Sequence, residues 1–369
     1  MKKLAIIGAN SFQNRLILKA KQLGYETHVF AWKCGDIGEK TADFFYPISI
    51  IEKELILEKC REIGICGICS IGSDLASVTV NYVAENMSLA CNKTKYTKMQ
   101  TNKYEMRKAF MLSGVPCPKF ISTKAEDYSD ELLDGFTFPI IVKPTDRSGS
   151  RNIMKLESTV GAKEAVAAAC ETSFEHKAII EEYITGEEYS METITYRGRH
   201  HYLATTKKFT TGAPHFIETG HTEPSGLGDE INEEAKEMIF KALDALHVEN
   251  SAGHSEFKVD KDGNIKIIEI GARMGGDCIG SDLVYLSTGY DFVKMVIDVA
   301  CGNEPDFEKG KSYKNAQIRF ILNMSDYEEY VRLKRDNKIN IVSETEIDLS
   351  ALDKTTSSAD RAGFYIFTE

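Results

Sequence analysis

The sequence lacks the features that mark membrane, nucleic-acid-binding and fibrous proteins. Its longest apolar runs, such as Leu4–Gly8 and Ile63–Ile68, are too short to span a bilayer. It has 45 Lys and Arg against 56 Asp and Glu, and no basic run that could form the positive face needed for duplex binding. With 27 glycines and 8 prolines in 369 residues, it is neither collagen-like nor proline-rich. We therefore expect a globular protein that binds neither a membrane nor nucleic acid.

Signals of secretion and of a disulfide framework are also weak. Met1–Lys3 and the apolar residues after it look like the start of a signal peptide, but the apolar stretch stops at Asn10 and no small-residue cleavage site follows. We predict a mature cytoplasmic N-terminus. The 9 cysteines are odd in number and scattered. Cys66 and Cys69 have the C-x-x-C spacing of redox or metal sites, but no second such pair exists, so buried reduced thiols are favoured.

Strand-like and helix-like segments alternate at the start of the chain. Apolar runs predict strands, and helical spacing predicts the segments between them, at 3–7, 11–23, 26–31, 43–48, 53–63, 64–71 and 74–86. This alternation predicts a parallel sheet covered on both faces. Gly8 follows the first strand without a G-x-G-x-x-G fingerprint, so we interpret it as a turn glycine.

The rest of the chain mixes both kinds of element. Helices are predicted at 101–113, 159–171, 229–246 and 289–301, and strands at 138–143, 178–184, 189–196, 255–259 and 265–270. The last two strands form a hairpin across an Asp-Gly-containing turn. Residues 207–228 are predicted to form a long polar loop, of the kind that is usually functional.

Two lysines and a loop of small residues suit an anionic ligand. Lys143 lies in an apolar strand-like segment, where an ammonium group is costly unless it meets an anion such as phosphate. Residues 146–152 combine arginines with small residues, whose backbone N–H groups can approach phosphate oxygens. A polar loop without a ligand is the alternative for that segment. Together with Lys103, these residues predict a phosphate-binding site.

Carboxylates recur in apolar segments. The backbone of Glu181–Ile184 could bind an adenine edge while Glu188 bonds ribose hydroxyls; an edge strand with solvated charges is the alternative. Glu256 and Glu269 lie in the two apolar strands of the predicted hairpin, where they can face each other. Two facing carboxylates repel unless a cation bridges them, so the pair suits Mg²⁺ that holds nucleotide phosphates.

Arg273 follows this hairpin and is placed to neutralise charge on a transferring phosphoryl group. The ordered set of these residues resembles the ATP-grasp superfamily over about residues 3–302. Two segments look like its L-amino acid ligase branch, namely the H-x-E strand at His254–Phe257 and the E-x-x-x-R-x-G-G segment at Glu269–Asp277. Glu218–Pro224 also resembles a loop of that branch near the acceptor site.

The resemblance implies an α/β protein with an ATP-grasp fold. Its expected parts are an N-terminal parallel α/β (pre-ATP-grasp) domain at 1–95, a linker helix and small α+β lid at 96–185, a larger α+β catalytic subdomain at 186–310 and a C-terminal strand-rich appendage at 311–369. The loops at 146–152 and after Lys207 would close over the site. The implied function is an ATP-dependent carboxylate–amine ligase that forms an amide through an acyl phosphate, with an amino acid substrate, and releases ADP and phosphate. Its partners would be a small-molecule carboxylate and amine, in the cytoplasm; family members are often homodimers.

By the same resemblance, each candidate residue takes a role. ATP would be bound by Lys103, Lys143, Ser148, Gly149, Ser150, Glu181, Glu182, Tyr183, Ile184 and Glu188. Glu256 and Glu269 would hold one or two Mg²⁺ ions, with Mn²⁺ able to substitute. Arg273 would stabilise the transferring phosphoryl group and the acyl phosphate, and His254 would be catalytic or else a structural hydrogen-bonding residue. His221, Gly275 and Gly276 would contact substrate, with His221 alternatively ordering its own loop.

One position departs from the family pattern. Many ATP-grasp enzymes have asparagine two residues after the second metal-binding glutamate, whereas Gly271 here has no side chain to bind a metal. This leaves the number of metal ions open. Two other functions stay open from sequence: a bicarbonate- or formate-using ligase of the carbamoyl-phosphate or biotin-carboxylase type, and an ATP-binding module without turnover.

Overall fold

The N-terminal part of the chain is a parallel sheet between two layers of helices. The computed structural model describes residues 1–149, 151–213, 216–313, 315–336 and 338–368. Strands β1 (Lys3–Ile7), β2 (Glu26–Phe30), β3 (Phe44–Tyr46) and β4 (Gly67–Cys69) pair in the order β3-β2-β1-β4, all parallel. Helices α1 (Ser11–Gln22), α2 (Ile37–Thr41), α3 (Lys53–Ile63) and α4 (Asp74–Asn86) connect and follow them.

Alternate side chains of β1 enter different cores, which explains the two helical layers. Leu4 and Ile6 pack with α1, whereas Ala5 and Ile7 pack with α3 and α4. The predicted parallel sheet covered on both faces is thus confirmed. Gly8 has φ +104°, and a Cβ there would lie 2.8 Å from Cγ of Gln13, so the turn after β1 requires glycine.

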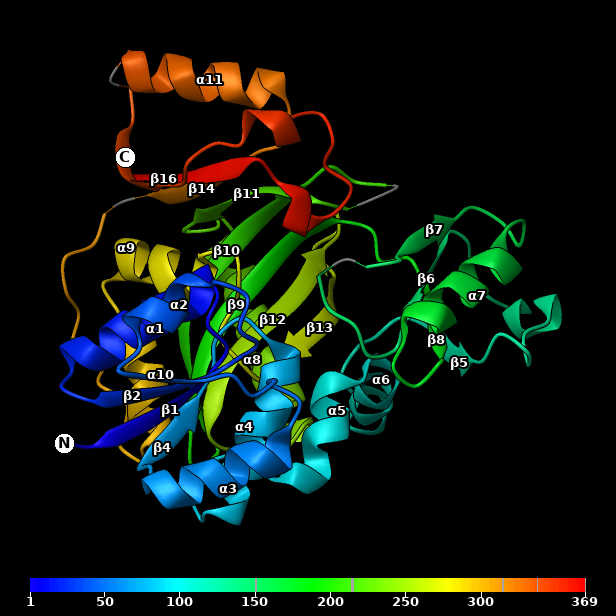
Figure 1. Cartoon of the computed structure of the whole chain (residues 1–369). Coiled ribbons are helices and arrows are strands. Elements are labelled where there is room, and N and C mark those ends of the chain that lie inside the picture. The colour runs from blue at the N-terminus through cyan, green and yellow to red at the C-terminus, as the bar shows by residue number, and fades with distance from the viewer. Residues whose placement is uncertain (150, 214–215, 314, 337, 369) are drawn as a thin grey trace.

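A small antiparallel sheet projects to one side of the molecule, on the right in Figure 1. Its strands are β5 (Phe120–Thr123), β6 (Ile140–Pro144), β7 (Met154–Leu156) and β8 (Ala178–Glu182), in the order β5-β8-β6-β7. Helix α7 (Ala162–Thr172) covers one face, and its alanine-rich side packs on Val142 and Ile180. A 3₁₀ turn (Thr94–Tyr96) and helices α5 (Thr97–Thr101) and α6 (Lys103–Leu112) lead into this sheet.

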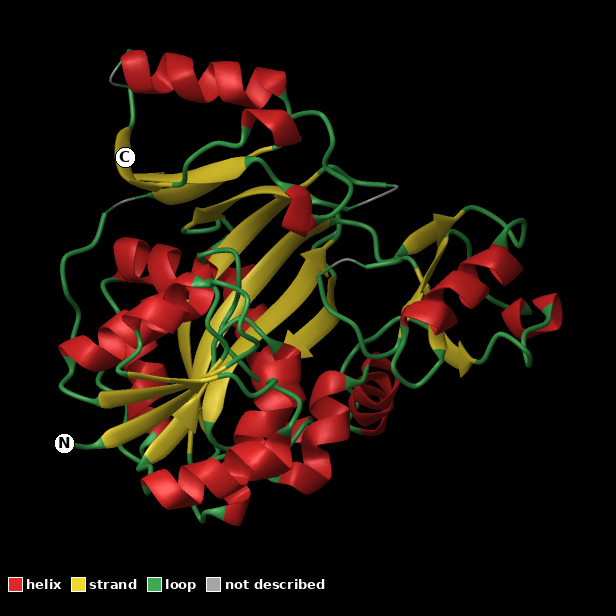
Figure 2. Ribbon diagram, in the orientation of Figure 1, coloured by secondary structure: helices red, strands yellow, loops and turns green. Residues whose placement is uncertain are grey.

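The largest sheet has eight strands and runs through the centre of the molecule (Figure 2). Their order is β13-β12-β9-β10-β11-β14-β16-β15, with bounds Glu187–Tyr196 (β9), Arg199–Thr210 (β10), Glu218–Glu223 (β11), Ser251–Val259 (β12), Ile265–Gly271 (β13), Ala316–Ile321 (β14), Asn340–Glu344 (β15) and Gly363–Thr368 (β16). Helix α8 (Asp229–Ala245) shares a core with β12 and β13, and α10 (Phe292–Ala300) shares a core with both this sheet and β1. The remaining elements are a π-helix (Ile279–Leu283), α9 (Val284–Thr288), α11 (Met324–Arg335) and 3₁₀ turns at Asp130–Leu133, Leu349–Ala351 and Ser358–Asp360.

One sequence expectation is wrong. The predicted loop at 207–228 contains the end of β10 and all of β11, and the strand from Arg199 onward was missed. The segment of β11 is polar, and its pairing with β10 and β14 satisfies its backbone, which the local hydrophobic pattern does not record. In the segment expected as a C-terminal strand-rich appendage, β14, β16 and β15 continue the central sheet, and a helix, α11, lies among them.

Other boundaries shift because of local capping. The helix predicted at 101–113 is divided at Asn102, whose side chain caps α6 by accepting the backbone N–H groups of Tyr104 and Glu105 at 3.1 Å. Asp291 similarly starts α10 later than predicted. All nine cysteines are free thiols, with Cys69 buried and Cys66 half-buried. Among the described residues, no helix is long and apolar enough to cross a membrane.

Candidate active site

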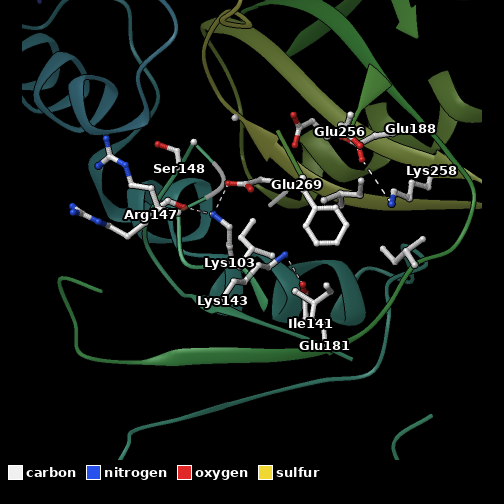
Figure 3. Close-up of a pocket in the computed structure, with 18 of the residues that line it drawn as sticks. Lys103, Ile141, Lys143, Arg147, Ser148, Glu181, Glu188, Glu256, Lys258 and Glu269 are labelled. Carbon is white, nitrogen blue, oxygen red and sulfur yellow. Dashed lines mark hydrogen bonds and ion pairs between the residues drawn. The ribbon is translucent and has the colours of Figure 1, made fainter. Parts of the chain in front are cut away.

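Most of the candidate residues meet in one cleft of about 190 Å³ between the small sheet and the central sheet. The structure places there Lys103, Lys143, Ser148, Gly149, Glu181, Glu182, Tyr183, Ile184, Glu188, His254, Glu256, Glu269 and Arg273. His221 and Gly276 instead line a second, larger cavity, and Gly275 lies behind His254. Ser150 lies outside the described residues. Figure 3 shows Lys103 facing Glu269 of the hairpin and Lys143 facing Glu181 of the small sheet.

Lys103 links the loop after β6 to the hairpin. It is the first residue of α6, and its ammonium donates to the backbone carbonyl of Arg147 at 2.7 Å and to Oε1 of Glu269 at 2.9 Å (Figure 3). Asp146 fixes the base of this loop by accepting the backbone N–H groups of Phe174 and Glu175, at 3.1 and 2.9 Å. The loop therefore presents Ser148 and Gly149 toward both cavities from an anchored base.

Lys143 meets a protein carboxylate rather than an open anion site. Its ammonium lies 2.6 Å from Oε2 of Glu181, and both side chains are buried. Arg107 of α6 also donates through Nε to Glu181. Burial alone would raise the pKa of Glu181, but the Arg107 guanidinium and the Lys143 ammonium together lower it to about 2. Glu181 is therefore a buried anion, and the alternative of a solvated edge strand is wrong for it.

The chain after Glu181 is tied to the small sheet by its backbone. The N–H groups of Glu182 and Tyr183 donate to the carbonyls of Lys119 at 3.0 Å and Pro139 at 2.9 Å. The Glu182 carboxylate accepts the backbone N–H of Thr137 at 2.9 Å. These bonds fix the backbone of residues 182–184, which line the wall of the cleft.

Glu256 and Glu269 are direct neighbours across β12 and β13, as the hairpin prediction requires. Each faces a lysine: Glu269 bonds Lys103, and Glu256 bonds Lys208 of β10, which also lies 3.4 Å from Glu188. Burial alone would lower the pKa of Lys208, but the carboxylates of Glu256 and Glu188 raise it above its ordinary value. Each of the two carboxylates therefore has an ammonium partner inside the cleft.

This carboxylate pair suits a magnesium ion shared with a nucleotide. No group of three or more His, Cys, Asp or Glu side chains arranged to hold a metal occurs in the part of the chain that the structure describes. Mg²⁺ in phosphate-transfer sites is commonly bound by one or two carboxylates, with substrate phosphates and water completing the octahedron. The two-carboxylate set therefore fits Mg²⁺ in the presence of a polyphosphate and does not form a closed metal cage.

His254 is held by a buried carboxylate that sequence reasoning missed. Its Nδ1 contacts Glu192 of β9, which is fully buried, and its Nε2 lies 3.3 Å from Glu256. Burial would lower the pKa of His254, but Glu192 and Glu256 raise it to about 9. Glu192 also accepts the backbone N–H of Gly275 at 3.2 Å, and a Cβ on Gly275 would lie 2.7 Å from Nδ1 of His254. Glycine at 275 thus allows the loop to approach this pair.

Arg273 is bound by Asp74 at the start of α4, 199 residues away in sequence. Its Nε and Nη2 donate to the two carboxylate oxygens at 2.8 and 3.1 Å. The guanidinium fills the space beside Gly271, where a Cβ would lie 2.9 Å from its Cζ. The position that many ATP-grasp enzymes use for an asparagine is here filled by an arginine side chain.

The second cavity, of about 650 Å³, shares a wall with the first. Both are lined by Lys103, Arg147, Ser148, Gly149, Arg151, Lys208, Glu218, His254, Glu256, Glu269 and Arg273. The larger cavity adds residues of the N-terminal segment, such as Phe12 and Leu75, and residues of the C-terminal segment, such as Ser358 and Arg361. Two ligand spaces therefore meet at the lysines, the carboxylate pair and Arg273.

Sequence reasoning missed Arg107, Lys208, Glu192 and Asp74. A signal existed for Arg107, because it shares a helix face with Met106 and Phe110, both buried, so a charged residue was predictable in the core. Lys208 was hidden by the wrong loop prediction. Asp74 lies in α4, next to the N-terminal parallel sheet, whereas Arg273 follows β13 of the central sheet. No local sequence pattern connects the two residues.

Comparison with known proteins agrees with this arrangement. Residues 136–282 match the family model described as the ATP-grasp domain. The chain is 27% identical to alanine–anticapsin ligase of Bacillus subtilis over 310 residues, which cover 74% of this chain and 65% of that protein. It is 22% identical to D-alanine–D-alanine ligase of Pseudomonas putida, over 54% of this chain and 63% of the relative.

Solved structures give the same fold. The L-amino acid ligase of Bacillus licheniformis superposes with a TM-score of 0.83 at 21% identity, covering 100% of this chain and 93% of the other. Phosphoribosylglycinamide synthetase from Anaerococcus prevotii superposes with a TM-score of 0.78 at 22% identity, over 100% and 94%. The chain thus has the ATP-grasp fold, as predicted, and spans 65% of the length of the curated relatives that it matches first.

Proposed function

We propose that this chain, an ATP-grasp protein, is an ATP-dependent carboxylate–amine ligase that acts on an amino acid. The observation that carries the proposal is the pair of cavities that meet at Lys103, Glu256, Glu269 and Arg273. The smaller cleft holds the residues expected to bind ATP, and the larger cavity has room for two small substrates beside the phosphates. The names of the relatives, alanine–anticapsin ligase and D-alanine–D-alanine ligase, support this class of reaction.

The reaction follows from ordinary carboxylate chemistry. A carboxylate oxygen attacks the γ-phosphorus of ATP, the bond to the ADP oxygen breaks, and an acyl phosphate forms. The amine nitrogen then attacks the acyl carbon, the carbon–oxygen bond to phosphate breaks, and the amine loses a proton. The protein's task is to hold the reactants in line and to neutralise negative charge. In this proposal, Lys103, Lys208 and Arg273, which line the larger cavity, neutralise the charge that develops.

Glu256 and Glu269 would hold Mg²⁺, or Mn²⁺ in its place, together with the nucleotide phosphates. When bound, the ion neutralises phosphate charge beyond what the lysines supply. Arg273 occupies the space beside Gly271, so we propose that its guanidinium supplies the positive charge near a position that carries an additional metal ligand in many members of the fold. Lys103 and Lys208 pair with these two carboxylates in the ligand-free structure.

Replacing Glu269 with glutamine should weaken Mg²⁺ binding in the presence of ADP at least tenfold. The amide keeps the shape and the contact with Lys103 but removes the negative charge that the cation requires. Titration calorimetry with Mg²⁺ and electron paramagnetic resonance with Mn²⁺ measure the change. Glu329→Gln, on the exposed face of α11, is the matched control. Unchanged affinity in Glu269→Gln would contradict the metal assignment.

The small sheet acts as a lid in this proposal. We assign residues 96–185 to the lid and its linker helix, between the N-terminal domain (1–95) and the catalytic subdomain (186–310). The loop that carries Ser148 and Gly149 lines both cavities, so it is placed to exclude water from the acyl phosphate. Because the reaction consumes ATP, we propose a cytoplasmic location.

Phosphate release tests the proposed function. The purified chain is incubated with ATP, Mg²⁺ and the twenty L-amino acids, singly and in pairs, and with bicarbonate. We expect release that requires an amino acid, with an amide product found by mass spectrometry in equal amount to ADP. Release with bicarbonate alone would point to the carboxylating alternative. Nucleotide binding without release under any condition would point to a module without turnover.

A further inference from the structure

Three polar side chains from separate segments meet on the wall of the larger cavity and do not line the smaller cleft. His221 comes from β11, Asp277 from the loop after β13, and Arg361 from the segment just before β16. Nη1 and Nη2 of Arg361 donate to the two oxygens of Asp277 at 2.9 and 2.6 Å. Arg361 lies outside the segment that matches the ATP-grasp family model, which ends at residue 282.

The Arg361 guanidinium is fixed before any ligand binds. It lies 3.6 Å from the centre of the Phe320 ring, in addition to its two bonds with Asp277. Asp277 and the next residue, Cys278, have φ values of +50° and +61°, a backbone conformation that side chains other than glycine rarely adopt. The loop thus accepts an unfavourable backbone and directs the Asp277 carboxylate to Arg361.

His221 supplies the observation that points to a ligand. It is 0% exposed, yet neither ring nitrogen has a hydrogen-bond partner within the described ranges. Its Nε2 lies 3.6 Å from Oδ2 of Asp277, beyond hydrogen-bond distance, and its ring meets Phe320 edge-on at 5.7 Å. Burial lowers the pKa of His221 although Asp277 acts in the opposite direction, and a neutral imidazole offers one donor and one acceptor. A buried polar group left without a partner is costly, and a bound ligand would remove that cost.

Arg361 has N–H donors that are not used by Asp277 and could bind such a ligand. A guanidinium has five N–H groups, and the two bonds to Asp277 use two of them. Carboxylates are the partners that match the planar fork of arginine. The wall of the cavity carries charges of both signs: six carboxylates (Asp74, Asp146, Glu218, Glu256, Glu269, Asp277) and six lysine or arginine side chains (Lys103, Arg147, Arg151, Lys208, Arg273, Arg361), beside His254. Charges of both signs suit a zwitterion, because its ammonium and its carboxylate can each contact an opposite charge.

We infer that Arg361 and His221 form a binding subsite for the carboxylate of the amine substrate, with Asp277 as the residue that positions Arg361. This inference rests on the proposed function and adds to it that the amine substrate is an amino acid with a free carboxylate. It also gives the C-terminal segment, which carries Arg361 and Ser358 to the cavity wall, a role in substrate selection.

Equilibrium binding tests the subsite without turnover. Titration calorimetry is performed with Mg²⁺, the β,γ-imido analogue of ATP, and each L-amino acid or its primary amide as the probe. We expect the wild-type protein to bind the preferred amino acid at least tenfold more tightly than its amide. In Arg361→Gln this ratio should fall to about one, and Arg361→Lys, which keeps the charge but not the fork, should lie between.

Arg335→Gln is the matched control, because this arginine lies in the same C-terminal segment but on the exposed face of α11. It should keep the wild-type ratio, and thermal unfolding should show that all variants are folded. Equal binding of acid and amide by the wild-type protein, absence of binding of every amino acid, or an unchanged ratio in Arg361→Gln would each overturn the subsite. Phosphate release that needs an amino acid would still support the proposed function in that event, so the two failures are distinguishable.

Discussion

Replacing Arg273 with lysine is expected to lower the rate constant for phosphate release about 1,000-fold, with ATP affinity changed by less than about threefold. Arginine offers a planar fork that matches an oxygen-rich transition state, whereas lysine offers one compact charge on a flexible stem. Groups of this kind that act on a transferring phosphoryl group contribute about 10³–10⁵ in rate. Single-turnover phosphate release and equilibrium nucleotide binding measure the two quantities separately.

The Arg273→Lys result has an internal check. Asp74 holds Arg273 through two bonds, so Asp74→Asn should lower the same rate constant, but less than Arg273→Lys does. Arg335→Lys on exposed α11 controls for the chemical change itself. If Arg273→Lys altered only ATP affinity and left the rate constant intact, Arg273 would belong to nucleotide binding and not to the transfer step.

Replacing Arg107 with methionine is expected to reduce the free energy of unfolding by about 3–5 kcal/mol, the cost of removing one partner of a buried ion pair. Arg107 and Glu181 are 1% and 4% exposed in their side chains, and Lys143 would remain as the single cation beside the carboxylate. Methionine keeps most of the apolar stem, so the loss reports on the charge. Urea unfolding followed by circular dichroism gives the free energy.

Two further variants are compared with Arg107→Met in the unfolding experiment. Arg332→Met on α11, where the side chain is 59% exposed, should change stability by less than about 0.5 kcal/mol. The double variant Arg107→Met with Glu181→Gln should not recover the loss, because the buried ammonium of Lys143 then has no carboxylate partner. A loss below about 1 kcal/mol in Arg107→Met would mean that water reaches this pair and that the core around it is not closed.

The sequence-based predictions succeeded where the neighbours of a residue in the sequence determine its environment. Lys143 and Glu269 each stand among apolar residues, so a buried or half-buried charge with a partner was predictable from their neighbours alone. The hairpin that carries Glu256 and Glu269 followed from one short turn, whereas their direct pairing depends on a β-bulge between Glu256 and Phe257. The alternation of strands and helices likewise determined the parallel N-terminal sheet.

What failed depends on contacts between distant segments. The ion pair of Lys143 with Glu181, a residue of the adjacent strand β8, was not predicted, and the binding of ATP phosphates by Lys143 stays a prediction. Lys208 and His221 lie on strands that were predicted as loop, since β11 is stabilised by pairing with β10 on one side and with β14 on the other. Asp74 and Arg361 reach the site from the two ends of the chain, and no local pattern marks either residue.

The central claim is that this site activates a carboxylate by phosphorylation, and oxygen transfer tests it most directly. The amino acid that supports phosphate release is supplied with ¹⁸O in its carboxylate, and the phosphate formed is analysed by mass spectrometry. An acyl phosphate intermediate predicts one ¹⁸O atom in each phosphate, because the carboxylate oxygen that attacks phosphorus leaves with it when the amide forms. Phosphate that carries no ¹⁸O would contradict the account, since ATP would then have been hydrolysed without activation of the carboxylate.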